Sequence, residues 1–193
     1  MDPWFGKALI IASSIVMVAI RAPHGQRSRA VKVARSRKGA SEIALLTFAW
    51  FAFVVPLMWV AAPVFAFADY PLRPTALFFG IVCLAVGLWI FARSHADLGP
   101  NWSITLEVRE GHQLVTRGIY RHVRHPMYFG LLVYSVGQAL VVPNWIAGPS
   151  YGLAMVLLCA FRLGPEERMM VEEFGADYMA YMRRTKRVVP GVW

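Results

Sequence analysis

The chain has 193 residues, of which 58% are hydrophobic and only 16% are charged. Soluble domains carry about 25% charged residues on average, so this composition excludes a disordered chain, a collagen and an ordinary soluble enzyme. It indicates a small integral membrane protein, although the formal net charge is +9. The two cysteines, Cys83 and Cys159, lie in apolar runs and therefore suggest neither a disulfide framework nor a metal cluster.

The apolar runs predict an all-α fold with five membrane-spanning helices in a single domain. A helix needs about 20 predominantly apolar residues to cross a bilayer. The expected spans are residues 4–20, 43–67, 75–92, 127–142 and 145–161. The first run has no basic segment before it and a basic block after it, so we interpret it as a retained span and not as a cleaved signal peptide.

Prolines and glycines add detail to two of these spans. Pro56 and Pro63 lie in the second run, where each would remove one backbone hydrogen bond and kink the helix. Gly80 and Gly87 lie in the third run, one above the other at a spacing of seven residues. Such small residues let a neighbouring membrane helix approach closely.

The basic residues predict the orientation of the chain. Seven of them and no acid lie between residues 21 and 38, and the two other segments on that side bring the total to 18 of 20. Only Lys7 and Arg73 lie on the opposite side. Because basic loops stay in the cytoplasm, we expect the N-terminus outside and the C-terminus in the cytoplasm, at the plasma membrane if the source is prokaryotic.

The basic run after the first span has two interpretations. Such a run is typical of nucleic-acid patches, but beside a membrane span the positive-inside rule and attraction to anionic lipids account for it. We therefore expect membrane lipids as partners of this run, and no nucleic acid. The oligomeric state is not encoded in any pattern of the sequence.

Polar residues gather in two segments, residues 111–128 and 162–167, which flank the last two spans. Only Pro143-Asn144 separates these spans, so we expect a tight antiparallel hairpin that brings both polar segments together at the cytoplasmic face. The predicted functional site is a cytoplasmic cap built from residues 93–126 and 162–193.

The tail after the fifth span has the pattern of an amphipathic helix. Phe174, Tyr178 and Tyr181 recur at helical spacing. Pro165 suits the first position of a helix, and Gly175 is expected to divide the tail into two short helices.

Arg162, Glu166 and Glu167 each have a structural and a functional interpretation. Arg162 is either a snorkelling interfacial residue or a buried group that grips a carboxylate or phosphate. It precedes Glu166 by four residues, which places both on one face if the helix continues through Gly164-Pro165. The two glutamates are either acids that stabilise a helix N-terminus or partners for a cationic ligand.

The histidines near the fourth span form only a weak metal-binding pattern. His122 and His125 are three residues apart, with His95 and His112 upstream. No cysteine or suitably spaced third ligand accompanies them, and a proline interrupts the pattern, so we expect no metal.

Several short motifs, taken together, resemble the isoprenylcysteine carboxyl methyltransferase family. They are Gly111-His-Gln-Leu-Val-Thr-Arg-Gly-Ile-Tyr120, Arg124-His-Pro-Met-Tyr128, Glu166-Glu167 and Phe174-Gly-Ala-Asp-Tyr178, with Leu98-Gly99 and Asn101-Trp102-Ser103 upstream. The resemblance covers about residues 93–190 and is to the short prokaryotic type with five spans. Arg-His-Pro-x-Tyr also occurs in phospholipid methyltransferases and sterol reductases, so the specificity lies in the order and spacing of the whole set.

The resemblance implies a cytoplasmic pocket for S-adenosylmethionine. The positions that match the cofactor-binding residues of the family are His112, Gln113, Leu114, Val115, Tyr120, His125, Pro126, Met127, Tyr128 and Glu166. Arg162 matches the arginine that faces the substrate and is the expected catalytic position. Larger relatives have a charged linker between this arginine and the glutamates, whereas this chain has Leu163-Gly164-Pro165. The implied reaction is methylation of the carboxylate of an isoprenylated cysteine that arrives from the bilayer.

Other functions stay open at this point. Phospholipid N-methylation and S-methylation of a small thiol would use the same cofactor. An oxidoreductase similar to sterol reductases would use NADPH, although such enzymes need more spans before the matching region. A membrane protein that retains the motifs without catalysis is a further alternative.

Overall fold

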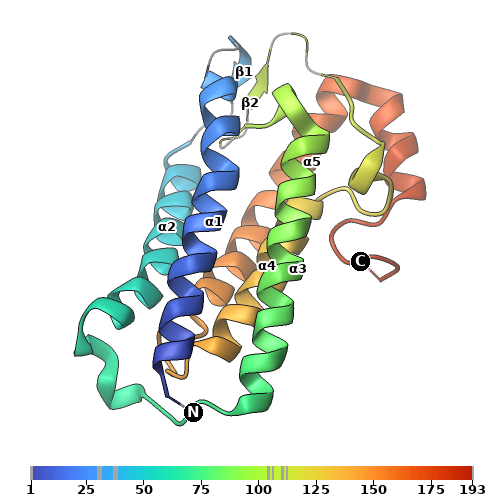
Figure 1. The fold of residues 1–193 in the computed structure, drawn as a ribbon. Helices are drawn as coiled ribbons and strands as arrows, with labels where there is room; N and C mark the ends of the chain where they lie inside the picture. Colours follow the sequence, from blue (N-terminus) through green and yellow to red (C-terminus); the bar gives the residue numbers. More distant parts are fainter. Residues whose placement is uncertain are drawn as a thin grey trace.

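The computed structural model describes residues 2–29, 32–36, 39–103, 105, 107–109, 111 and 113–192. Its long helices lie side by side in a bundle (Figure 1). They are α1 (Trp4–Arg29), α2 (Ala40–Ala61), α3 (Pro74–Leu98), α4 (Pro126–Val141) and α5 (Ser150–Arg184). The connections contain the short helices η1 (Pro63–Ala68), η2 (Gly99–Asn101) and η3 (Gly118–Arg121), and the strands β1 (Val33–Ser36) and β2 (Glu107–Arg109).

The bundle has two different ends (Figure 1). The N-terminus, η1 and the loop between α4 and α5 lie at one end, which is closed by polar contacts around Asp69. The indole nitrogen of Trp59 and the amide nitrogen of Asn144 donate to Oδ1 of Asp69 at 2.7 and 2.6 Å. The two strands, η3 and the last part of α5 lie at the other end. That end carries the polar cap.

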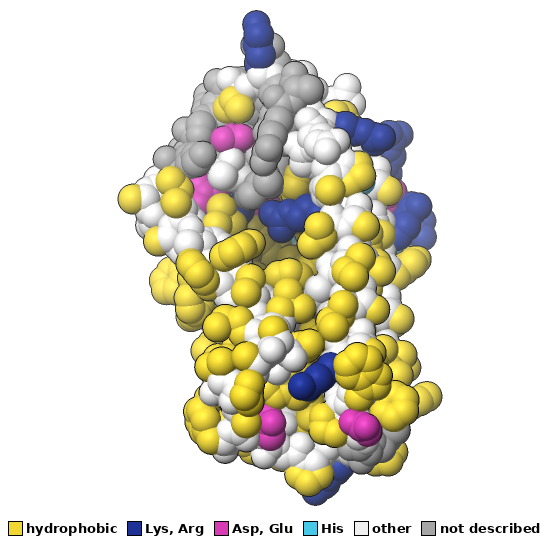
Figure 2. Space-filling view, turned by 60° about the vertical axis from the view of Figure 1, so that its left-hand side comes forward, with side chains coloured by type: hydrophobic (Ala, Val, Ile, Leu, Met, Phe, Trp, Pro, Cys, Tyr) yellow, Lys and Arg dark blue, Asp and Glu magenta, His cyan; other side chains and the backbone are white. Residues whose placement is uncertain are grey.

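The exterior of the bundle is that of a membrane protein. Among the described residues, three helical segments are long and apolar enough to cross a bilayer, Trp4–Arg27, Ala40–Ala61 and Pro74–Asn101. Large apolar side chains point outward from them, and Trp89 is 63% exposed. Figure 2 shows hydrophobic side chains over most of one face, with Lys and Arg gathered mainly toward one end. The chain is an integral membrane protein.

The structure confirms the first three predicted spans and changes several boundaries. α4 is a shorter apolar helix of 16 residues, and the fourth and fifth spans stay predictions. The second span ends at Ala61 and not at residue 67, because Ala62 is extended and Pro63 starts the separate helix η1. The last two helices are joined by residues 142–149, a longer connection than the predicted Pro143-Asn144.

The side chain of Asn144 explains that longer connection. Its Oδ1 accepts hydrogen bonds from the backbone nitrogens of Ile146 and Ala147 at 3.0 and 2.8 Å. An asparagine that bonds the backbone two and three residues on stabilises a turn in place of a helix. The sequence does show this turn residue, but the prediction placed Trp145 already inside the helix.

The prediction of an all-α fold was wrong in one detail. β1 and β2 form a two-stranded antiparallel sheet in which Val33 pairs with Arg109 and Ser36 pairs with Glu107. The strands have four and three residues, too few for an alternation of apolar and polar residues to identify them. The sheet links the segment after α1 to the segment before η3, at the polar end of the bundle.

α3 and α4 pack closely against each other along a seam of glycines. A Cβ atom placed on Gly87 would lie 2.6 Å from the backbone nitrogen of Tyr134 and 2.8 Å from the carbonyl oxygen of Gly130. A Cβ atom on Gly137 would lie 2.7 Å from the backbone nitrogen of Leu84. All three distances are shorter than a carbon atom tolerates, so only glycine fits at these two positions. The close approach predicted for Gly80 and Gly87 is confirmed.

α5 continues without a break through Pro165 and turns only at Gly175. Pro165 lies inside this helix and not at the start of a new one, so its predicted position at a helix N-terminus was wrong. The predicted division at Gly175 is confirmed, because this residue has a φ of 52° that side chains rarely allow. Tyr178 and Tyr181 are buried after this turn, in agreement with the amphipathic pattern of the tail.

Candidate active site

A cavity of about 590 Å³ lies where the bundle meets its polar end. This volume is in the range of small-molecule sites. Of the eleven site residues predicted from the sequence, the following line the cavity: Gln113, Leu114, Val115, Tyr120, His125, Pro126, Met127, Tyr128, Arg162 and Glu166. His112 lies outside the described residues. Segments that are up to 53 residues apart in the chain therefore meet around one space.

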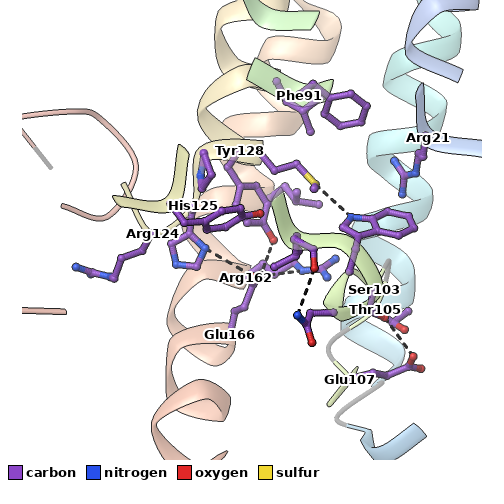
Figure 3. Close-up of a pocket in the computed structure, with 18 of the residues that line it drawn as sticks. Arg21, Phe91, Ser103, Thr105, Glu107, Arg124, His125, Tyr128, Arg162 and Glu166 are labelled. Carbon is purple, nitrogen blue, oxygen red and sulfur yellow. Dashed lines mark hydrogen bonds and ion pairs between the residues drawn. The ribbon is translucent and has the colours of Figure 1, made fainter. Parts of the chain in front are cut away.

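The polar wall of the cavity is built around the carboxylate of Glu166 (Figure 3). The hydroxyl of Tyr128 donates to Oε2 at 2.7 Å. Nε of Arg162 lies 3.5 Å from the same oxygen, and Nδ1 of His125 lies 3.6 Å from Oε1. His125 and Tyr128 come from the start of α4, while Arg162 and Glu166 are one turn apart on α5. The antiparallel packing of these helices explains why the two predicted segments meet.

These contacts keep Glu166 ionised although it is partly buried. Burial by itself raises the pKa of a carboxyl group, but hydrogen bonds from His125 and Tyr128 and the charges of His125 and Arg162 outweigh it and lower the pKa of Glu166 to about 2. Burial opposes protonation of His125, and here Glu166 and Glu167 outweigh burial and raise its pKa. The carboxylate of Glu166 is thus negatively charged at neutral pH.

The neighbouring Glu167 has a different role. It accepts hydrogen bonds from Nε of Arg124 at 2.8 Å and lies 2.8 Å from Nη2 of Arg187. Arg124 also donates to the carbonyl oxygens of Met182 and Thr185. These contacts join the start of α4, the middle of α5 and the C-terminal segment. Glu167 and Arg124 therefore hold the cap together, which explains why the motif contains both.

The C-terminal segment is fixed directly against the start of α4. The backbone nitrogens of Arg124 and His125 donate to the carbonyl oxygens of Lys186 and Arg187 at 2.8 and 2.9 Å. His125 is the last residue before α4, so this pairing sets the position of its ring. The sequence pattern contained no sign of this contact between residues about 60 positions apart.

Tyr120 lies on another wall of the cavity, where three segments meet. Its hydroxyl donates to the carbonyl oxygen of Ser94 at 3.3 Å, and its own carbonyl oxygen accepts from the hydroxyl of Tyr181 at 2.5 Å. Burial, together with the charge of Glu166, raises the pKa of Tyr120, so the phenol stays neutral. Beside it, the backbone nitrogen of Gln113 donates to Oδ1 of Asn101 at 3.0 Å.

Arg162 is buried, which favours the functional interpretation over a snorkelling residue. Only 8% of its surface is exposed, and Nη1 lies 3.7 Å from Oε1 of Glu42, in the first turn of α2. Because α5 is continuous, the same guanidinium group also contacts Glu166 one turn later. Glu42, itself buried, was missed in the sequence, where it is an isolated acid at the start of an apolar run.

The remaining wall of the cavity is apolar and comes from α1, α2 and the first turns of α5. The residues are Met17, Val18, Ala22, Leu46, Ala49, Trp50, Phe53, Tyr151, Met155 and Leu158. Sequence reasoning missed these residues because they look like any other apolar residues of a membrane helix. Their role depends on how the helices pack, and only the structure shows that.

Within the described part of the chain, His, Cys, Asp and Glu side chains do not come together in a group of three that could hold a metal ion. His122, one half of the weak motif, is exposed, and its Nε2 accepts a hydrogen bond from Nε of Arg121 at 2.9 Å. The other half, His125, is engaged with Glu166 and Glu167.

Known proteins match the part of the chain that contains the polar wall. The sequence pattern of the isoprenylcysteine carboxyl methyltransferase family matches residues 77–172. The protein-S-isoprenylcysteine O-methyltransferase of Dictyostelium discoideum is 31% identical over 115 residues, which are 58% of this chain and 48% of that protein. The chain is therefore similar to this family over about half of its length. The matched range contains the residues described for the polar wall, which are His125, Tyr128, Arg162 and Glu166.

Further relatives show the same similarity. The human protein of the same name is 33% identical over 113 residues, which are 58% of this chain and 40% of that protein. Form A from Arabidopsis thaliana is 31% identical over 116 residues, 59% of each chain. The matches thus span about half the length of these relatives. The family pattern begins after α1 and α2 and includes no residue of either helix.

A solved structure supports the same fold. The structure of a eukaryotic intramembrane Ras methyltransferase, an isoprenylcysteine carboxyl methyltransferase, superimposes with a TM-score of 0.55 at 22% sequence identity. The superposition covers 80% of this chain and 54% of that chain. At this identity the likeness concerns the arrangement of the helices.

Proposed function

We propose that this protein transfers a methyl group from S-adenosylmethionine to the carboxylate of a lipophilic acceptor, with the C-terminal carboxylate of an isoprenylated cysteine as the reference substrate. The observation that carries the proposal is that one cavity joins two environments (Figure 3). An ionised network surrounds Glu166 at one wall, and apolar side chains of α1 and α2 form another. A charged methyl donor needs the first environment and an isoprenoid tail needs the second.

The polar part of the cavity fits the proposed cofactor. S-adenosylmethionine carries a sulfonium and an ammonium group, and the ionised carboxylate of Glu166 faces the cavity. Leu114, Val115 and Tyr120 supply apolar and aromatic surface for an adenosine. His112, Gln113, His125, Pro126, Met127 and Tyr128 complete the proposed binding set. When bound, the cofactor would supply an electrophilic methyl group. An oxygen of the acceptor carboxylate would form the new C–O bond to this methyl group as the S–C bond breaks, and S-adenosylhomocysteine would leave.

The residues of the chain contribute positioning and exclusion of water. A carboxylate has an unperturbed pKa of about 4, so the acceptor is ionised at neutral pH and needs no general base. Arg162, held between Glu42 and Glu166, can orient the acceptor carboxylate without protonating it. The apolar walls remove water from the acceptor, which strengthens its electrostatic contacts and helps to hold it in a reactive geometry.

The acceptor is proposed to arrive from the bilayer between α1 and α2. Met17 and Val18 on α1 face Leu46 and Trp50 on α2 across the cavity. Figure 2, in which the side that bears these helices comes forward, shows a hollow bordered by hydrophobic side chains. A lipid tail could therefore enter sideways while the polar cofactor reaches the cap from the aqueous side.

We also propose that the polar cap lies in the cytoplasm and the N-terminus outside, at the plasma membrane in a prokaryotic source. The support is the excess of basic residues at the cap end. Cysteine variants Arg73→Cys and Glu173→Cys, made without Cys83 and Cys159, test it in intact cells. Only the first should react with a membrane-impermeant maleimide, and the reverse result would invert the orientation.

A methyl-transfer assay tests the proposed reaction. The purified protein in detergent is given S-adenosylmethionine with a labelled methyl group and, in turn, N-acetyl-S-farnesylcysteine, phosphatidylethanolamine and a small thiol. We expect label in the farnesylcysteine as a base-labile methyl ester. Label in the phospholipid amine or in the thiol would replace the proposed acceptor, and no label in any of them would overturn the proposed activity.

A further inference from the structure

Arg21 is a cation in the cavity that the proposed mechanism does not use. It lies on α1 beside Met17 and Val18, in a part of the chain outside the family match. Figure 3 shows it on the α1 side of the cavity, across from Arg162 and Glu166. In the sequence it is the first of the seven basic residues after the first span, which the positive-inside rule explains as a group.

The position of Arg21 is set by a buried aromatic cluster. Its guanidinium carbon lies 5.5 Å from the ring centre of Trp102, which is almost completely buried. The indole nitrogen of Trp102 donates to Sδ of Met127, and the ring of His95 lies 4.9 Å away. A cation within about 6 Å of the centre of an indole ring is attracted to the face of that ring. An arginine that only sets the orientation of the chain in the membrane does not require a contact of this kind.

Arg21 and Arg162 differ in their acidic neighbours. Arg162 contacts two carboxylates, Glu42 and Glu166. Arg21 forms no ion pair with any acid in the described parts of the chain, and the positive charge of Arg162 acts on it unfavourably. The α1 side of the cavity therefore carries an excess positive charge next to apolar walls, where a bound anion would be attracted strongly.

We propose that Arg21 binds the anionic head group of the acceptor together with Arg162. This inference rests on the proposed function and deepens it, because it requires the acceptor to be an anion and assigns its recognition to α1. The head group is a carboxylate or a phosphate, since a guanidinium group binds both through paired hydrogen bonds. Arg21 acts in recognition, so its loss should raise KM for the acceptor and leave kcat and cofactor affinity nearly unchanged.

The test compares Arg21→Gln with the matched control Arg27→Gln. Both variants remove one charge from the same helix end, but Arg27 does not line the cavity. With N-acetyl-S-farnesylcysteine, we expect KM to rise about tenfold in Arg21→Gln and to stay within about twofold in the control. Binding of S-adenosylhomocysteine by calorimetry should be equal in both, which shows that the variants are folded.

A neutral analogue separates charge recognition from packing. The amide of N-acetyl-S-farnesylcysteine should inhibit the wild-type protein about tenfold more weakly than an acid analogue that cannot be methylated, such as the corresponding sulfonate. In Arg21→Gln this preference for the anion should largely disappear. Phosphatidic acid, tested as an inhibitor, distinguishes a lipid phosphate from a carboxylate as the recognised group.

Arg21→Lys covers the case in which the glutamine variant is not stable. It keeps the charge and loses the paired hydrogen bonds, so an intermediate KM is expected. An unchanged KM and an unchanged preference for the anion in both variants would overturn the role of Arg21. By contrast, a wild-type protein that methylates no acceptor of the panel would overturn the proposed function itself, so the two failures can be told apart.

Discussion

The α3–α4 seam and the cavity are two interfaces of the same bundle with opposite packing. At the seam, Gly87 and Gly130 allow the two backbones to approach so closely that a single methyl group does not fit. At the cavity, α1 and α2 meet α5 through long side chains such as Met17, Phe53 and Met155, and about 590 Å³ stays open between them. Residue size therefore decides where the bundle is rigid and where it can hold a ligand.

Because the α3–α4 seam and the cavity are packed so differently, substitutions at the two places should have different consequences. A membrane bundle that lacks a large hydrophobic driving force between its helices depends on close packing for stability. A substitution at the seam should thus remove the folded protein, whereas a substitution at the cavity should remove binding and leave the fold intact. The following predictions sharpen or break this contrast, from the largest expected effect to the smallest.

Gly87→Leu should cause the largest effect. The new side chain would collide with the backbone of Tyr134 and with Gly130, which forces α3 and α4 apart. Overpacking of this kind costs about 3 kcal/mol. We expect a large drop of the unfolding temperature in detergent, followed by circular dichroism.

Gly164→Ala is the matched control for the seam. No atom lies within 4 Å of the added carbon, and alanine is the better helix former. Its unfolding temperature should equal or exceed that of the wild type. A Gly87→Leu protein with wild-type stability would show that the seam does not hold the bundle together.

Glu166→Gln should keep the fold and lose cofactor binding. The substitution removes the charge that His125, Tyr128 and Arg162 surround. Hydrogen bonds to charged groups are worth about 1.5–3 kcal/mol, so affinity should fall roughly 10- to 100-fold by calorimetry with S-adenosylmethionine. Glu173→Gln, on an exposed part of α5, is the control. Equal affinities of the two variants would refute the role of Glu166.

Substitution of Arg162 should weaken binding of the acceptor more than binding of the cofactor. The variant Arg162→Met is combined with Glu42→Gln so that the buried carboxylate of Glu42 does not face a missing arginine, while Glu166 keeps its contacts with Tyr128 and His125. We expect KM for N-acetyl-S-farnesylcysteine to rise about tenfold, while cofactor affinity changes about threefold at most. If the cofactor affinity fell instead and KM stayed constant, Arg162 would belong to the cofactor site.

His125 should produce the smallest effect, a pH dependence of stability. Its pKa is raised in the folded protein, because Glu166 and Glu167 outweigh the opposing effect of burial. The stabilisation is therefore complete below the ordinary value of about 6.5 and is lost as the pH rises through the higher folded value. The two glutamates have pKa values of about 2 and do not titrate in this range.

The measurement is the unfolding temperature of wild type and His125→Asn between pH 6 and pH 9. The difference should be largest at pH 6 and should shrink toward pH 9, by a few degrees in total, since each kcal/mol corresponds to about 2–4 °C in a chain of this size. A difference that grows with pH would mean that His125 is neutral in the folded protein.

The sequence was sufficient for the elements that local patterns determine. The apolar runs predicted the first three spans, and the spacing of Gly80 and Gly87 predicted a close helix contact. The meeting of the segments around His125 and Glu166 followed from their places before and after one helical hairpin. In each case the information lies within a few residues or in the order of elements.

Features that depend on the packing of distant segments could not be predicted. Glu42 and Arg21 carry no local motif. The contact of Glu42 with Arg162 and the contact of Arg21 with the cavity depend on the rotation of α2 and α1 about their axes. The pairing of Arg124 with the carbonyl oxygen of Lys186 joins residues far apart in the chain. The continuation of α5 through Pro165 was also missed, because a proline usually marks a helix start or a kink.

Calorimetry of the wild-type protein in detergent tests the central claim most directly, because it asks what the cavity binds. S-adenosylmethionine and S-adenosylhomocysteine should each bind at one site per chain, and NADPH should give no heat of binding. Binding of NADPH without either adenosyl compound, or binding of none of the three, would contradict the account.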